Sequence, residues 1–215
     1  MATRHRIERL KRRASRPLIL ASQSAARKKW LAKIVRARFP EIQIEIQPAH
    51  LDERAVVREE MARAKTRDVR MAKKIAARLA REKALAVQAG DLAKEVLGSD
   101  QLLWLDGEIL GKPGTAANAR RMLAKCAGQT GYLVTSVALA GERVRVLTQV
   151  NTLRFAKLDR ASIARIVELD QPLACAGSFM FEEHGATLFD SVKTDDPTGI
   201  EGLSIMRVIR LLSFS

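Results

Sequence analysis

The chain has 215 residues, of which 47% are hydrophobic, and a formal net charge of +14. This length allows one domain with a sizeable core, and no apolar run approaches the roughly 18 residues needed to span a bilayer. We expect no secretory signal, because the N-terminus has no apolar stretch. We expect no zinc site, because the two cysteines and three histidines are scattered along the chain. Two cysteines far apart in the sequence fit a protein of the reducing cytoplasm.

The positive charge is concentrated in two segments. Residues 1–38 hold thirteen lysines and arginines against one acid, and residues 58–83 hold ten against four. We expect residues 1–16 to form a basic extension ahead of a globular domain over residues 17–215. The extension has two interpretations. It is a solvated or helical arm, or it binds a polyanion such as RNA, the ribosome or an anionic membrane surface.

The apolar pattern predicts a first strand at residues 18–21. A helix follows over residues 25–37, where apolar side chains recur with helical period after two capping serines. Residues 42–47 alternate as in a half-exposed strand. The stretch from about 55 to 89 is helix-forming and predicts one long helix.

The stretch VLGSDQLLWLDGEILGKP, residues 96–113, predicts a buried hairpin. Asp106-Gly107 provides the tight turn, because both residues tolerate positive φ. Asp100 lies inside the apolar strand, where a carboxylate is costly unless it is paired or binds a cation. Lys112, at the far end of the hairpin, could return towards it.

The remaining pattern mixes strands and helices without strict alternation, which favours an α/β fold with a mixed sheet. The predicted elements are a helix from Thr115 to Cys126, strands at 132–140 and 143–155, a helix from Asp159 to Leu169, a strand at 186–192 and a helix at 203–212.

Polar residues next to the first two strands have two interpretations each. Ser22 and Ser24 are either helix caps or, with the positive helix end, a cradle for phosphate. Arg27 and Lys28 in the first helical turn oppose the helix dipole, which is easier to explain if an anion binds there. Asp52-Glu53 is either a cap or a pair of hard oxygen ligands for Mg²⁺ or Mn²⁺.

Two carboxylates and three cations together suit phosphoryl-transfer chemistry. Glu53 and Asp100 supply anionic oxygens for a divalent metal, and Arg27, Lys83 and Lys112 suit the charged phosphate oxygens. Alone, Lys83 could equally be a solvated helix charge. The chain has no Walker sequence, because Gly111-Lys112-Pro113 lacks the upstream glycine.

Several motifs resemble the Maf family of nucleoside triphosphate pyrophosphatases from about Leu18 to Leu212. They are LILASQSAARKKWL, HLDER, RLAREKA, VLGSDQ, LDGEILGKP, ACAGSFMFEEHGATLFDSV and GIEGLSIMRVIRLL. The resemblance implies an elongated bent mixed sheet flanked by helices, in two lobes with a central cleft. It also implies a metal-dependent enzyme that converts a nucleoside triphosphate to its monophosphate and pyrophosphate. Homodimers are consistent with it.

The resemblance also implies roles for individual residues. Asp100 would be the catalytic carboxylate and a metal ligand, with Glu53 as its acidic companion. Gly-Ser-Asp-Gln and CAGSF followed by an acid are closest to the branch that acts on 7-methyl-GTP. The phosphate-binding set would be Ser22, Ser24, Arg27, Lys28, Lys83 and Lys112, and the base-specificity set Ala26, Gln101 and Glu182.

The chain departs from the family pattern at Ala26, which leaves space where a large side chain would help to read the base. The segment between Glu53 and Lys83 is about ten residues longer than usual, and it is basic. The basic charge of residues 1–38 and the change at Ala26 favour an alternative hypothesis, a polyanion- or partner-binding regulatory protein, linked to division or stress, on a Maf scaffold. The retained acids and lysines favour the enzyme.

Overall fold

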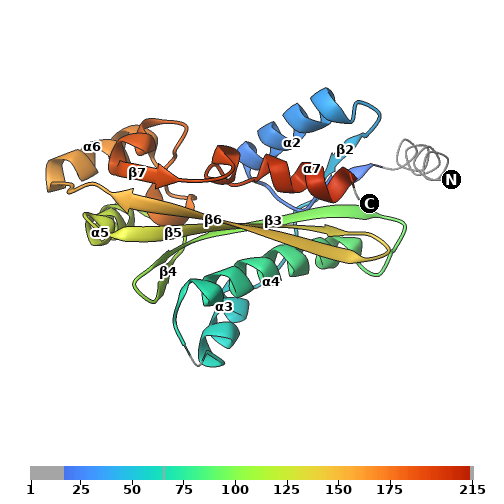
Figure 1. Ribbon diagram of the computed structural model, residues 1–215, viewed down its shortest axis with the longest axis horizontal. Coiled ribbons are helices and arrows are strands. Elements are labelled where there is room, and N and C mark those ends of the chain that lie inside the picture. The colour runs from blue at the N-terminus through green and yellow to red at the C-terminus, as the bar shows by residue number, and fades with distance from the viewer. Residues whose placement is uncertain (1–16, 65, 214–215) are drawn as a thin grey trace.

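The computed structural model describes residues 17–64 and 66–213. These residues form an elongated molecule built on one long sheet (Figure 1). The predicted basic extension, residues 1–16, lies outside the described residues. In the described part of the chain, no helix is both long and apolar enough to cross a membrane.

The sheet has seven strands and is mixed, as predicted. Its central strand β3 pairs in parallel with β1, which pairs in parallel with β2, whereas β3, β5, β6 and β7 pair antiparallel in that order. The short strand β4 pairs with the far end of β3. The strands are β1 (Leu18–Leu20), β2 (Ile44–Ile46), β3 (Glu95–Leu105), β4 (Glu108–Leu110), β5 (Thr130–Ala140), β6 (Val144–Phe155) and β7 (Phe189–Lys193).

Helices flank the sheet, as predicted (Figure 1). Helices α3 and α4 cover one face, while α2 and α7 lie together on the other, and α5 and α6 pack at one end. The helices are α2 (Ala25–Arg38), α3 (Glu53–Ala62), α4 (Val69–Gln88), α5 (Ala116–Cys126), α6 (Arg160–Asp170) and α7 (Ile205–Ser213). Three short 3₁₀ helices are η1 (Ala176–Ser178), η2 (His184–Leu188) and η3 (Pro197–Gly199).

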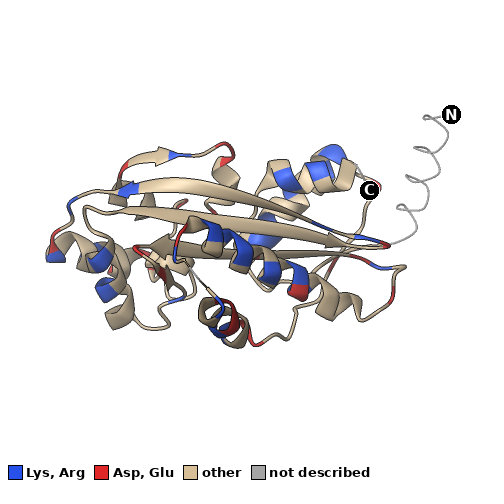
Figure 2. Ribbon diagram, turned by 60° about the horizontal axis from the view of Figure 1, so that its bottom comes forward, with Lys and Arg blue, Asp and Glu red and all other residues tan. Residues whose placement is uncertain are grey.

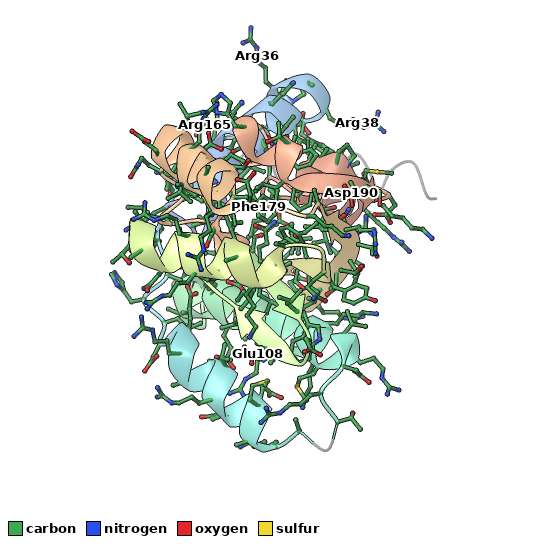
Figure 3. All side chains as sticks on the ribbon, turned by 90° about the vertical axis from the view of Figure 1, so that its left-hand side faces the viewer. Arg36, Arg38, Glu108, Arg165, Phe179 and Asp190 are labelled. Carbon is green, nitrogen blue, oxygen red and sulfur yellow. The ribbon has the colours of Figure 1, made fainter. Side chains whose placement is uncertain are left out.

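The apolar core divides into separate groups along the sheet. One group, between α5, α6 and the sheet, contains Phe155, Phe179 and Phe189, whose ring centroids lie 4.7 to 6.3 Å apart. A second group joins α2 and α7 to β1. Figure 3 shows Phe179 in the interior, whereas Arg36 projects outward from α2. Two further groups pack between α4 and the sheet. The two lobes and the central cleft stay predictions.

The prediction of one helix from 55 to 89 was wrong. The chain forms α3, turns, and begins α4 at Val69. Asp68 causes the restart, because its side chain accepts a hydrogen bond from the backbone N–H of Arg70 at 2.8 Å and so caps α4. The segment contains neither glycine nor proline, so the helical pattern continues through the break.

The predicted hairpin is confirmed, and the predicted strand at 186–192 is only half right. Asp106 and Gly107 both have positive φ, at 45° and 80°, as a tight turn between β3 and β4 requires. The strand begins only at Phe189, because residues 184–188 form η2.

Candidate active site

The centre of the site is the middle of β3, where Gly98 lets α4 approach closely. A Cβ atom at position 98 would lie 2.1 Å from the carbonyl oxygen of Ala80 and 2.8 Å from the backbone nitrogen of Ala84. Only a glycine fits between the strand and α4 at this separation. The close contact brings Lys83, which lies between those two alanines, onto the same strand.

Lys83 connects the two predicted carboxylates. Its Nζ atom donates to Oδ1 of Asp100 at 2.5 Å and lies 2.8 Å from Oε1 of Glu53. Lys83 and Asp100 are both buried, with 7% and 5% of their surfaces exposed, whereas the Glu53 side chain is 42% exposed. Glu53 begins α3, and the preceding Asp52 caps that helix by accepting from the backbone N–H of Ala55 at 2.9 Å. Asp52 is therefore a cap, and Glu53 reaches the site.

The two carboxylates differ in how readily they ionise. Burial raises the pKa of Asp100, against the opposing effects of the Lys83 and Arg27 charges. Burial also disfavours ionisation of Glu53, but Lys83, Lys112 and Arg27 attract its charge and bring its pKa below the ordinary value. The site therefore holds one carboxylate that favours the charged form and one that holds a proton more readily than an exposed aspartate.

Arg27 forms the second side of the site, at the start of α2. Its guanidinium donates to the backbone oxygen of Ser99 at 2.8 Å, to that of Gly202 at 3.0 Å and to Oγ of Ser22 at 3.3 Å. Ser24 caps α2, and its Oγ accepts from the backbone N–H of Arg27 at 3.4 Å. Burial lowers the pKa of Arg27 even though Asp100 and Glu53 attract its charge. The cation is thus held in place before any ligand binds.

The other two predicted phosphate-binding residues are less closely engaged. Lys28 is exposed on α2. Lys112 is also exposed, because β4 ends at Leu110 and the chain leaves the hairpin before Lys112. Its charge still lowers the pKa of Glu53. The direct partner of Asp100 is therefore Lys83 from α4, rather than Lys112 from the hairpin.

Gln101 is held by the segment around η3. Its Nε2 atom donates to the backbone oxygens of Gly199 at 2.8 Å and Ile200 at 3.1 Å, and to Oγ1 of Thr135 at 3.0 Å. Three acceptors share the two amide hydrogens, so the protein itself occupies the donor side of Gln101. Its carbonyl oxygen is the part that remains for a ligand.

The other predicted base-specificity residues lie on α2 and ahead of η2. Ala26 is half-buried, and Glu182 is exposed. Partial burial raises the pKa of Glu182, and so do the charges of Glu201 and Glu183. Glu201 in turn accepts a hydrogen bond from the indole N–H of Trp30 at 2.8 Å.

Sequence reasoning missed several backbone and polar groups that shape the site. The carbonyl oxygen of Gly202 accepts from both Arg27 and Oγ of Ser99, which is fully buried. The segment that carries Gly202 is fixed by buried Asp196, which accepts from Oγ of Ser204 at 2.7 Å and from the backbone N–H of Met206 at 2.8 Å. In the sequence, the signal that could have pointed to this close packing was the pair of small residues Gly98 and Ser99 inside an apolar strand.

The oxygen ligands for a metal ion are few. Among the described residues, no group of three or more histidines, cysteines, aspartates and glutamates could hold a metal ion. Asp100 and Glu53 nevertheless present two carboxylates to one ammonium group. Mg²⁺ is commonly bound by one or two carboxylates together with substrate phosphates and water, so this pair fits such an ion.

The fold and these residues can be compared with known proteins. The 7-methyl-GTP pyrophosphatase of Alkalilimnicola ehrlichii is 39% identical over 199 residues, which cover 91% of this chain and 92% of that protein. The 7-methyl-GTP pyrophosphatase of Pseudomonas aeruginosa is 34% identical over 198 residues, covering 91% and 94%. A nucleoside-triphosphatase / dITP/XTP pyrophosphatase from Mycobacterium abscessus matches in structure over 66% of this chain and 75% of its own, with a TM-score of 0.44 and 14% identity.

The family model described as Maf-like protein matches residues 17–214. This range contains every predicted site residue, from Ser22 to Glu182. The resemblance seen in the sequence motifs is confirmed, and the chain belongs to the Maf-like protein family.

Proposed function

We propose that this protein hydrolyses a nucleoside triphosphate to its monophosphate and pyrophosphate. The observation that carries the proposal is the buried pair of Asp100 and Lys83 beside Glu53, with the fixed guanidinium of Arg27 nearby. The relatives' names, 7-methyl-GTP pyrophosphatase, support the same reaction. A pure binding protein gains little from grouping a buried carboxylate with a second carboxylate and two cations, because a buried ion pair is often no more stabilising than an apolar pair of the same volume.

The triphosphate is bound by the cations around the two carboxylates. Arg27 presents a planar donor group that is already oriented by Ser22, Ser99 and Gly202, so little entropy is lost when a phosphate binds. The start of α2, capped by Ser24, adds the positive end of a helix. Lys112 is exposed and free to reach the outer phosphates.

The chemical step is attack of water on the α-phosphorus. The bond from that phosphorus to the bridging oxygen of the β-phosphate breaks, pyrophosphate leaves, and the nucleoside monophosphate remains. Asp100 accepts the proton of the attacking water, and its raised pKa makes it a better base than an exposed aspartate. Lys83 stabilises the charge that develops on the phosphate oxygens.

A divalent cation, Mg²⁺ or Mn²⁺, completes the site in this proposal. Asp100 and Glu53 are the residues that would hold it. The ion supplies neutralising charge and Lewis acidity to the phosphates. Glu53 suits this role, because its lowered pKa keeps it charged at neutral pH.

The proposed base is 7-methylguanine or a related purine. A carboxylate at Glu182 accepts hydrogen bonds from the N1–H and exocyclic amine of guanine, whereas thymine and uracil offer only one such donor. The carbonyl oxygen of Gln101 is a further acceptor for the base. Ala26 leaves the pocket open, so we expect a preference over dTTP and UTP of only about 10–100-fold.

A panel of 7-methyl-GTP, GTP, dTTP and UTP with Mg²⁺ or Mn²⁺ tests the proposal. We expect equal amounts of pyrophosphate and nucleoside monophosphate, without orthophosphate. Orthophosphate with a nucleoside diphosphate would show cleavage at the wrong bond. No turnover of any triphosphate would refute the enzymatic proposal, whereas a best rate with dTTP or UTP would refute only the assignment of the base.

A further inference from the structure

Helices α3 and α4 and the segment between them carry a basic surface that the proposed reaction does not use. We infer that this surface binds the phosphate backbone of a nucleic-acid duplex. The basic surface consists of Arg54, Arg58, Arg63, Arg67, Lys73 and Arg81, all exposed. Figure 2 shows bands of lysine and arginine along α4.

The acids of the two helices do not neutralise this surface. Between residues 53 and 88 the chain has five acids, and each forms an ion pair with another residue of the same segment. Their partners are Arg70, Lys74, Arg78 and Lys83. Within residues 17–64 and 66–213, none of the six cations of the basic surface is in an ion pair, so their charges remain available to a partner.

The two helices form a rigid support for these charges. Arg78 of α4 donates to Glu59 and Glu60 of α3 and to Glu82 of its own helix, at distances between 2.6 and 2.9 Å. Glu60 is buried, with 3% of its surface exposed, and Lys74 lies 2.7 Å from its second oxygen. These bonds fix α3 and α4 relative to each other, so the backbone that carries Arg54, Arg58, Lys73 and Arg81 is ordered before a partner binds.

The spacing of the cations suits a linear polyanion. At 1.5 Å per residue, Lys73 and Arg81 lie about 12 Å apart along α4, and Arg54 and Arg58 lie about 6 Å apart along α3. Five of the six are arginines, whose guanidinium groups match phosphate oxygens in pairs. A single phosphate or a small nucleotide would meet only one or two of these groups.

Two other partners fit the surface less well. A membrane-bound helix needs an exposed apolar face, but the large exposed apolar side chains of the described residues lie at Ile46, Leu92, Leu169 and Met206, outside both helices. Single-stranded nucleic acid is usually held by stacking on aromatic side chains, and residues 53–88 contain none. A duplex bound through its backbone requires neither feature.

The test compares two full-length variants that lose the same number of charges. In the surface variant, glutamine replaces Arg63, Arg67, Lys73 and Arg81. In the control variant, glutamine replaces four exposed cations around α6: Arg154, Lys157, Arg160 and Arg165. Figure 3 places Arg165 on the opposite side of the molecule from α3. The N-terminal segment is the same in both.

Binding of a 20-base-pair RNA duplex and of a DNA duplex is measured across a range of salt concentrations. Each lost phosphate contact lowers the slope of log K against log salt by about 0.9, so we expect the surface variant to lose about 2 or more in slope and tenfold or more in affinity. The control should stay within about twofold of the wild type in affinity, because it removes charge but no contact.

Three results would overturn the inference. Equal losses in both variants would show that only the net charge matters, and no duplex binding by the wild type would remove the partner. Tighter binding to vesicles of anionic phospholipid, lost in the surface variant alone, would assign the surface to a membrane. Circular dichroism and the thermal midpoint confirm that both variants are folded.

Discussion

Replacing Gly98 by alanine tests how the site is built. The added Cβ atom would lie 2.1 Å from the carbonyl oxygen of Ala80, whereas non-bonded heavy atoms rest at roughly 3.5 Å. Helix α4 must therefore move away from β3 by about 1 Å or more. Lys83 moves with the helix, which lengthens its 2.5 Å contact with Asp100.

Both stability and activity should fall in this variant. Forcing an extra carbon into a packed interface costs about 1–3 kcal/mol. A shift of about 1 Å in a catalytic group can reduce the rate by about 100-fold. We expect the urea midpoint to fall and kcat/KM for 7-methyl-GTP to drop by about two orders of magnitude. The loss in kcat/KM should be the same for every nucleoside triphosphate, because the displaced Lys83 lies near the phosphates and not near the base.

Gly141→Ala is the matched control. A Cβ atom at position 141 would lie 3.9 Å from its nearest neighbour, Cγ of Glu95, which is an ordinary contact. We expect stability and activity close to the wild type, with a gain of up to about 1 kcal/mol from the stiffer unfolded chain. A folded Gly98→Ala protein with activity within threefold of the wild type would refute the argument that this glycine sets the position of Lys83.

Three further substitutions address charge and hydrogen bonding in the site. Lys83→Met should lower the free energy of unfolding at pH 7 by about 3–5 kcal/mol, because it leaves a buried carboxylate unpaired. Burial raises the pKa of Asp100, so Asp100 should become protonated as the pH falls towards 5, and the difference in unfolding free energy between this variant and the wild type should shrink. Urea titrations at several pH values would measure this difference, and a difference that does not change with pH would contradict the reasoning. Arg27→Lys keeps the charge but loses the planar donor group, and kcat/KM should fall about 10–100-fold; an unchanged value would count against a role in phosphate binding. Glu182→Gln should reduce the preference for 7-methyl-GTP over UTP, since charge-assisted hydrogen bonds of about 1.5–3 kcal/mol are weakened; an unchanged ratio of kcat/KM values would exclude Glu182 as a base-reading residue.

Local signals predicted most of the secondary structure. Ser24, Thr115 and Asp159 each cap the helix that follows, as their side chains suggested. Asp106-Gly107 forms the expected turn. The break before α4 was missed because the apolar residues keep a helical period on both sides of Asp68. The break is seen in the structure, where the side chain of Asp68 accepts a hydrogen bond from the backbone N–H of Arg70.

The site was harder to predict because its contacts join distant residues. The cost of burying Asp100 predicted that a cation must lie beside it, and the hairpin suggested Lys112. The true partner, Lys83, comes from α4, and that contact depends on the helix lying close to Gly98. Likewise, the bonds from Arg27 and Ser99 to the carbonyl oxygen of Gly202 involve backbone groups, which have no signature in a sequence.

The most direct test of the proposed mechanism is the rate of pyrophosphate release from 7-methyl-GTP by Asp100→Asn. The amide has nearly the same shape as the carboxylate, but it cannot accept the proton of water or balance a divalent charge. We predict a loss of about 10³-fold or more in kcat at saturating metal, while Asp190→Asn, at an exposed carboxylate, stays at the wild-type rate. A folded Asp100→Asn protein within tenfold of the wild type would contradict the central role of Asp100.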